Sequence, residues 1–168
     1  MQPFRHLSNP TPMWWLTFAL CLFQGSCGRG IVDPPPSADD PLKVTIRQGV
    51  AGRVWFLQGD YFSGGPITAT PVKRPILVYT PTKWDSVVRV GYSAFYSRIL
   101  STFVGETISN DSGFFQLSLP VGHYSIFVQE DTLFYSNSFD GEGYIQPVAV
   151  STDSVTSTNV NITYQTDY

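Results

Sequence analysis

Cysteine, histidine and charged residues are all scarce in this sequence of 168 residues, and each shortage excludes a class of protein. The two cysteines, Cys21 and Cys27, both lie near the start, so the rest of the chain has no disulfide framework and must fold around an apolar core. Charged residues make up 14% of the chain, against roughly 25% in an average soluble domain. With a net charge of −3, the composition argues against nucleic acid as a partner.

Catalytic and metal-binding patterns are also missing. After the first few residues the chain contains a single histidine, His123, whereas zinc sites use several His or Cys ligands at short spacing. A Ser-His-Asp triad would depend on that same residue, and no phosphate-binding loop of the Gly-x-x-x-x-Gly-Lys type occurs. The sequence therefore predicts a protein that is not an enzyme, with no catalytic residue, no cofactor and no strong metal site.

Long hydrophobic runs are lacking too, and the one short run has the features of an export signal. Residues 13–23 form a mostly apolar stretch of about 11 residues, too short for a membrane span of about 20 but suited to a signal-peptide core of about 7–15. Arg5 precedes this stretch, and Gly25, Ser26 and Cys27 follow it. This order is typical of a bacterial lipoprotein signal over residues 1–26, with Cys27 as the lipidated first residue, although Gln24 stands where that signal prefers Leu. The alternative is ordinary cleavage near residues 26–28 and a secreted protein.

A proline-rich stretch separates the signal from the remaining chain. Residues 27–45 contain three successive prolines, Pro34 to Pro36, which favour an extended polyproline conformation. We interpret this stretch as a tether between membrane and domain. The remaining residues, 46–168, have the usual size of one domain.

That domain is predicted to be all-β, because short alternating apolar runs bounded by Gly, Pro, Asn and Asp recur along it. Phe115, Leu117 and Leu119 alternate with Gln116 and Ser118, as expected for a sheet with one buried face. The pattern predicts a single antiparallel β-sandwich of about seven strands. The expected strands lie at residues 49–57, 75–79, 103–109, 115–119, 124–128, 148–150 and 160–164.

Residues 107–128 carry a recognisable motif, in which Gly113 and Phe115 are followed by Pro120, Gly122 and Tyr124. This motif resembles the hallmark of the carboxypeptidase regulatory-like domain, and the chain is similar to small envelope lipoproteins of Bacteroidetes-type bacteria that carry it. The resemblance implies a transthyretin-like or Ig-like sandwich, with turns at the two glycines and core positions at Phe115 and Tyr124. It predicts no activity, because function on such folds lies in their loops. Residues 58–72 and 82–102 are longer than the usual connections, and such loops are more often functional or mobile.

Aromatic residues gather in the segments that the pattern gives as loops. Exposed aromatic rings often mark contacts with proteins or sugars, so these segments are candidates for ligand binding. The alternative is that they fold back and cap the ends of the sandwich. The candidate ligand-binding residues are Tyr61, Phe62, Trp84, Tyr135, Phe139 and Tyr144.

Acidic residues dominate the second half of the domain, where residues 99–168 include no Lys or Arg. Asp131, Asp140 and Glu142 form a weak candidate for a calcium site, since calcium binds several oxygen ligands. Their spacing matches no EF-hand loop, and a solvated acidic loop is the alternative.

Together these patterns predict an exported protein of the cell envelope, held in the outer membrane through a lipid on Cys27. Its expected role is that of a non-catalytic binding or assembly module whose partner is an envelope protein or a glycan. Two alternatives stay open at this point. One is an accessory subunit of a nutrient-uptake or secretion complex, and the other is a small enzyme of unrecognised type.

Overall fold

A computed structural model describes residues 42–60 and 64–167. The predicted signal segment, the lipidation residue Cys27, most of the tether and the candidates Tyr61 and Phe62 lie outside the described residues. Within the described part of the chain, no helix is long and apolar enough to cross a membrane.

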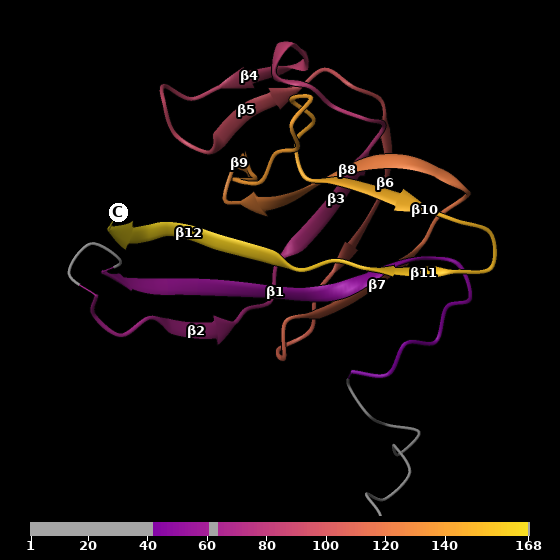
Figure 1. Cartoon of the computed structure of the whole chain (residues 1–168), viewed down its shortest axis with the longest axis horizontal. Helices are drawn as coiled ribbons and strands as arrows, with labels where there is room; N and C mark the ends of the chain where they lie inside the picture. The colour runs from indigo at the N-terminus through magenta and orange to yellow at the C-terminus, as the bar shows by residue number, and fades with distance from the viewer. Residues whose placement is uncertain (1–41, 61–63, 168) are drawn as a thin grey trace, which may run out of the picture. The chain divides into compact units, whose positions relative to one another are not determined.

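Strands make up almost all of the regular structure, and they form two sheets (Figure 1). The single exception between residues 42 and 167, outside the gap at 61–63, is a 3-10 turn, η1 (Trp84–Ser86). The described residues contain twelve strands: β1 (Gly49–Asp60), β2 (Thr68–Pro71), β3 (Pro75–Tyr79), β4 (Val87–Arg89), β5 (Phe95–Ile99), β6 (Phe103–Ile108), β7 (Phe114–Ser118), β8 (Gly122–Glu130), β9 (Leu133–Tyr135), β10 (Pro147–Val150), β11 (Val155–Ser157) and β12 (Val160–Asp167).

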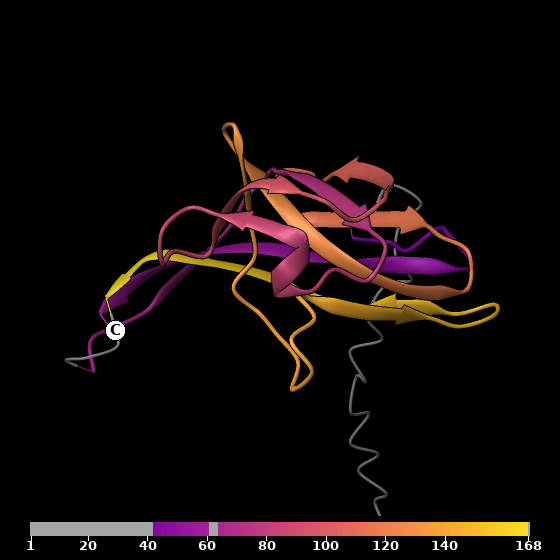
Figure 2. The same cartoon turned by 90° about the horizontal axis from the view of Figure 1, so that it is seen from above.

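The long strand β1 organises the first sheet. Its first half pairs antiparallel with β7 and parallel with β11, and its second half pairs antiparallel with β2 and parallel with β12. The second sheet has the order β4-β5-β9-β8-β3-β6, and β10 pairs with β8. Figure 2 shows β1 and β12 side by side in one layer of this arrangement. The prediction of an all-β sandwich with mainly antiparallel sheets is confirmed.

The main core lies between the two sheets. The first sheet contributes Val50, Val54 and Phe115, and the second contributes Ile76 and Ile126, all of them fully or almost fully buried. The motif residues Phe115 and Tyr124 both belong to this core, in agreement with the role that the motif implies.

A second core covers the outer face of the second sheet. Leu77, Tyr79 and Phe127 point to this face and pack against Tyr96 and Ile145. The Phe127 ring makes edge contacts with Tyr79 and Tyr96, each with ring centroids 5.7 Å apart. Strand β8 is therefore buried on both faces, and residues 82–102 are not the loop that the sequence predicts. They form η1, β4 and β5, which cover the sheet because the apolar residues of its outer face need shielding from water.

The glycine of the first turn of the motif has a conformational role. Gly113 has φ +74°, and a side chain there would place Cβ 2.5 Å from the carbonyl oxygen of Val54. The Val54 N–H donates to the Gly113 carbonyl over 2.9 Å, so this turn docks against β1. The Asn110 side chain accepts N–H groups from Ser112 and Phe114, each over 3.0 Å, and so closes the turn.

The glycine of the second turn provides space rather than an unusual backbone angle. The Tyr124 hydroxyl donates to the Pro120 carbonyl over 2.9 Å and ties the turn to β8. A Cβ atom on Gly122 would lie 3.1 Å from that hydroxyl. The Pro-x-Gly-x-Tyr spacing thus places a residue without a side chain next to the tyrosine hydroxyl that donates to the proline carbonyl.

Candidate ligand-binding groove

Three segments that are distant in the sequence meet around one groove of about 560 Å³. They are the turn between β4 and β5, the residues from the end of β9 to Phe139, and the end of β12. Its volume lies within the range of about 300–1,000 Å³ that is typical of small-molecule sites. The lining residues are Arg89, Tyr92, Ser93, Ala94, Phe95, Tyr135, Asn137, Phe139, Thr163 and Tyr164.

Aromatic rings form the base of the groove. The Phe95 ring lies 5.1 Å from the rings of both Tyr135 and Tyr164, measured between centroids. Tyr135 is buried, and its hydroxyl accepts the Thr163 N–H over 2.9 Å. The Asn137 amide donates to the Thr163 side-chain oxygen over 2.7 Å. Strand β12 is in this way bonded to the end of β9 and to the residues that follow it, which fixes the base.

An ion pair behind the groove holds Tyr164. Arg74 is paired with Glu130, and the second oxygen of Glu130 accepts the Tyr164 hydroxyl over 3.0 Å. Burial raises the pKa of Tyr164, and the hydrogen bond to Glu130 raises it further. The phenol therefore acts as a neutral donor, and the hydrogen bond fixes its ring at the edge of the groove.

A stacked pair of rings supports one wall, which Phe139 lines. The Trp84 and Phe139 rings are nearly parallel, with an interplanar angle of 16° and centroids 4.1 Å apart. The Arg89 guanidinium lies 5.0 Å from the centre of the Trp84 ring, which is a cation–π distance. Trp84 and Phe139 remain 40% and 37% exposed, so both are supported by neighbours and still reach the surface.

Tyr92 stands at the rim and is fully exposed, at 100%. The turn that carries it is fixed by several hydrogen bonds. Arg89 donates to the carbonyl oxygens of Ser93 and Tyr92, and the Ser93 hydroxyl donates to the Val90 carbonyl over 2.6 Å. An ordered turn thus carries an aromatic ring that is exposed to water.

The structure separates the candidates that the aromatic pattern groups together. Tyr135 and Phe139 line the groove, and Trp84 supports it by its stack on Phe139. Tyr144 does not line it, because this residue lies against Lys83, whose ammonium group is 4.5 Å from the ring centre. Capping and exposure therefore both occur: Tyr135 is a buried core residue, whereas Phe139 is partly open to solvent.

Several lining residues are missing from the sequence-based candidates. Tyr92 and Phe95 belong to an aromatic-rich segment, but their exposure depends on the turn between β4 and β5. Tyr164 follows the alternation of a strand, so the sequence gives no sign that it also borders a groove. Arg89, Asn137 and Thr163 carry no local signal at all, since their roles arise from contacts between distant segments.

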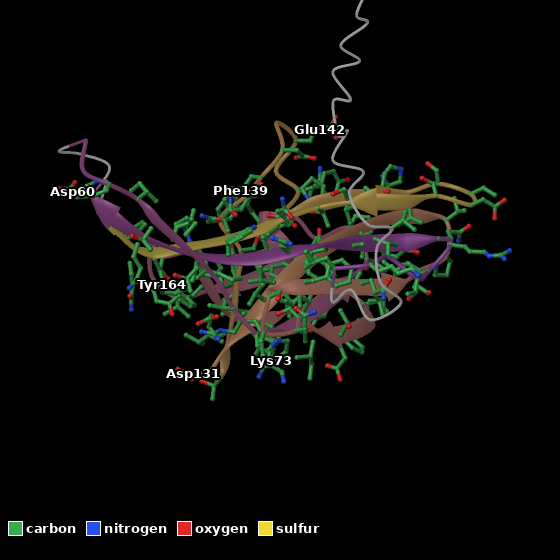
Figure 3. The ribbon with its side chains drawn as sticks, turned by 90° about the horizontal axis from the view of Figure 1, so that it is seen from below. Asp60, Lys73, Asp131, Phe139, Glu142 and Tyr164 are labelled. Carbon is green, nitrogen blue, oxygen red and sulfur yellow. The ribbon has the colours of Figure 1, made fainter. Side chains whose placement is uncertain are left out.

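The three acidic residues of the calcium hypothesis do not form one site. Figure 3 shows Asp131 and Glu142 at the tips of two segments that project in opposite directions. The Asp140 carboxylate accepts the N–H groups of Glu142 and Tyr144, over 2.9 and 2.8 Å, and so closes its own loop. Among the described residues, no group of three or more His, Cys, Asp or Glu side chains is placed to hold a metal ion.

Comparisons of the chain with protein-family models, with curated proteins and with solved structures give no match. The resemblance to the carboxypeptidase regulatory-like domain therefore remains a prediction that depends on the motif residues. The geometry of the groove is the basis for the proposals that follow.

Proposed function

We propose that this protein is a non-catalytic binding module of the cell envelope, anchored in the outer membrane by a lipid on Cys27, and that it binds its partner in the aromatic groove. The signal pattern and the proline-rich tether support export and anchoring. The observation that carries the binding role is the fully exposed Tyr92 on an ordered turn at the rim of the groove.

Exposing an aromatic ring to water is unfavourable. The turn that carries Tyr92 is nevertheless ordered in a conformation that leaves the ring in solvent. Binding loses less conformational entropy when the segment that carries the contacting side chain is already ordered. Tyrosine and tryptophan are also enriched among the residues that dominate binding energy at interfaces. An exposed tyrosine on an ordered turn beside a groove suits a binding surface.

The chemistry of the lining residues supports binding without catalysis. Apart from tyrosines, Arg89 is the only ionisable residue among the described residues that line the groove. These residues therefore include no carboxylate or imidazole that could act as a general acid or base. The Tyr164 hydroxyl already donates to Glu130, and the Tyr135 and Thr163 side chains bond to each other. These groups therefore hold the shape of the groove.

A second candidate, an accessory subunit of a larger envelope complex, is favoured by the edge strand β6. Phe103, Val104 and Ile108 on this strand are 50%, 37% and 61% exposed. Within the described sheet, β6 pairs only with β3, and exposed apolar edge strands tend to pair with other chains. An Ile108→Lys variant that no longer co-purifies with an envelope complex would support this second role.

Site-specific photo-crosslinking in intact cells tests the proposed groove. A photoreactive phenylalanine analogue at position 92 is expected to form a discrete adduct in the envelope fraction. The same analogue at Val121, which is 57% exposed and does not line the groove, provides the matched control. Equal labelling from both positions, or labelling from neither, would contradict the proposal.

A further inference from the structure

We propose that the ligand of the aromatic groove is a neutral glycan chain, an inference that rests on the proposed binding function. Sugars present apolar C–H faces and polar hydroxyl edges in alternation. A complementary site needs aromatic ring faces for the C–H faces and hydrogen-bonding side chains for the hydroxyl edges.

The groove offers both kinds of surface side by side. Its accessible rings are Tyr92, Phe139 and Tyr164, which are 100%, 37% and 41% exposed. Aromatic faces carry partial negative charge and attract polarised C–H groups, which suits stacking against a sugar ring. Among the described residues, the Asn137 side chain makes one hydrogen bond, to Thr163, so its carbonyl oxygen and second N–H remain for a ligand hydroxyl.

The charge of the lining indicates that the glycan is neutral. Among the described lining residues, Arg89 is the only side chain with a permanent charge, and two nitrogens of its guanidinium group already donate hydrogen bonds, to the carbonyl oxygens of Ser93 and Tyr92. Its cation also lies over the Trp84 ring. Arg89 thus stabilises the rim turn and the ring stack, and an acidic sugar would find no second cation among the described lining residues.

The arrangement fits a glycan better than a protein partner. Hot spots of protein interfaces lie in well-packed, fully desolvated pockets. In this groove the exposed rings share the lining with the Asn137 amide, while the Ser93 hydroxyl is already bonded within its turn. Phe139 stacks on Trp84, and Tyr164 donates to Glu130, so these two rings are held in place before binding, which lowers the entropy cost of capturing a flexible chain.

Affinity electrophoresis of the detergent-solubilised full-length protein tests this inference. Gels contain dextran, laminarin, glucomannan or xyloglucan as neutral probes, and alginate as an acidic probe. At least one neutral polysaccharide is expected to retard the protein. Tyr92→Ala is expected to weaken retention at least tenfold, whereas Tyr92→Trp retains it and Tyr92→Leu does not, because stacking needs a planar ring.

Controls separate loss of binding from loss of fold. Tyr92 is fully exposed, so its variants are expected to unfold at the same temperature as the natural protein. Ile108→Ala, at an exposed position away from the groove, is expected to leave retention unchanged.

Three results would overturn the inference. Retention by alginate alone would exclude a neutral ligand, and retention that survives Tyr92→Ala would exclude the groove. If no neutral probe retards the protein while position 92 crosslinks to an envelope protein, the inference of a glycan ligand is wrong, but the proposed binding function is supported. If neither retention nor crosslinking occurs, both proposals fail.

Discussion

Buried hydroxyl groups differ in how well the fold satisfies them. Ser109 is fully buried, and its hydroxyl donates to the Val72 carbonyl over 2.9 Å and accepts the Arg74 N–H over 2.8 Å. Ser136 is also buried, but its hydroxyl has no hydrogen-bond partner among the described residues. A buried polar group without a partner costs about 1–3 kcal/mol in desolvation. The two serines therefore have opposite effects on stability.

Replacing Ser136 with alanine is expected to increase the free energy of unfolding by about 1 kcal/mol, because it removes a hydroxyl that is desolvated and unbonded. Ser109→Ala is the matched control and is expected to decrease the free energy by a similar or larger amount, since it leaves the Arg74 N–H without its acceptor. Urea denaturation of both variants measures the difference. A loss of stability in Ser136→Ala would show that the hydroxyl has a partner.

The Tyr96 hydroxyl gives the fold a sensitivity to alkaline pH. Burial raises the pKa of Tyr96 to about 12 from its ordinary 10.0, and Tyr135 adds to this effect while Arg89 opposes it. Because the folded pKa is the higher one, the contribution to stability is complete below pH 10 and is lost as the pH rises towards 12. We expect the unfolding free energy to fall between about pH 10 and about pH 12, and to fall less in Tyr96→Phe. Parallel profiles for the two proteins would contradict this assignment.

Strand β8 shows how neighbouring elements change the environment of a strand. Its inner residues, such as Ile126 and Val128, face the main core, and its outer residue Phe127 is buried under β5 and the loop that contains Ile145. In a simple two-layer sandwich, the outer face of such a strand would be in contact with water. The second core therefore makes β4 and β5 part of the stable fold.

Phe127→Ala tests whether this second core contributes to global stability. The variant is expected to lose about 3–5 kcal/mol of unfolding free energy, the usual cost of truncating a buried phenylalanine. Ile108→Ala on the exposed side of β6 serves as control and is expected to change stability by less than about 0.5 kcal/mol. Urea unfolding followed by intrinsic fluorescence measures both. A loss below about 1 kcal/mol in Phe127→Ala would mean that the covering segment unfolds separately.

The sequence predicts the longer strands well and the short ones poorly. All seven expected strands are present, because runs such as residues 75–79 and 160–164 are long enough to show an apolar pattern or alternation. The missed strands are β4, β9 and β11, with three residues each, β2, with four, and β5, whose sequence Phe-Tyr-Ser-Arg-Ile does not alternate; none of them shows a clear period. These strands form because a neighbouring strand provides hydrogen-bond partners for their backbone. This is a tertiary effect that the local sequence does not predict.

The candidate site is predictable only in part for the same reason. Aromatic composition identifies Trp84 and Phe139, but their stacking joins η1 to a loop more than fifty residues away. The exposure of Tyr92 follows from the hydrogen bonds of a turn that the sequence gives as part of a loop. Tyr164 has the pattern of an ordinary strand residue, so its place beside Phe95 and Tyr135 emerges only when β12 pairs with β1.

The proposed anchor and the proposed binding site lie in separate parts of the chain, since the described strands begin at Gly49 and the lipid would attach at Cys27. Cys27→Ser is therefore expected to move the protein from the membrane fraction to the soluble fraction without changing its thermal unfolding. Each buried methylene of a lipid contributes about 0.8 kcal/mol, so loss of the acyl chains removes most of the membrane affinity. Cys21→Ser is the matched control: that residue belongs to the predicted signal and is expected to leave fractionation unchanged. A Cys27→Ser protein that stays in the membrane fraction would refute lipid anchoring.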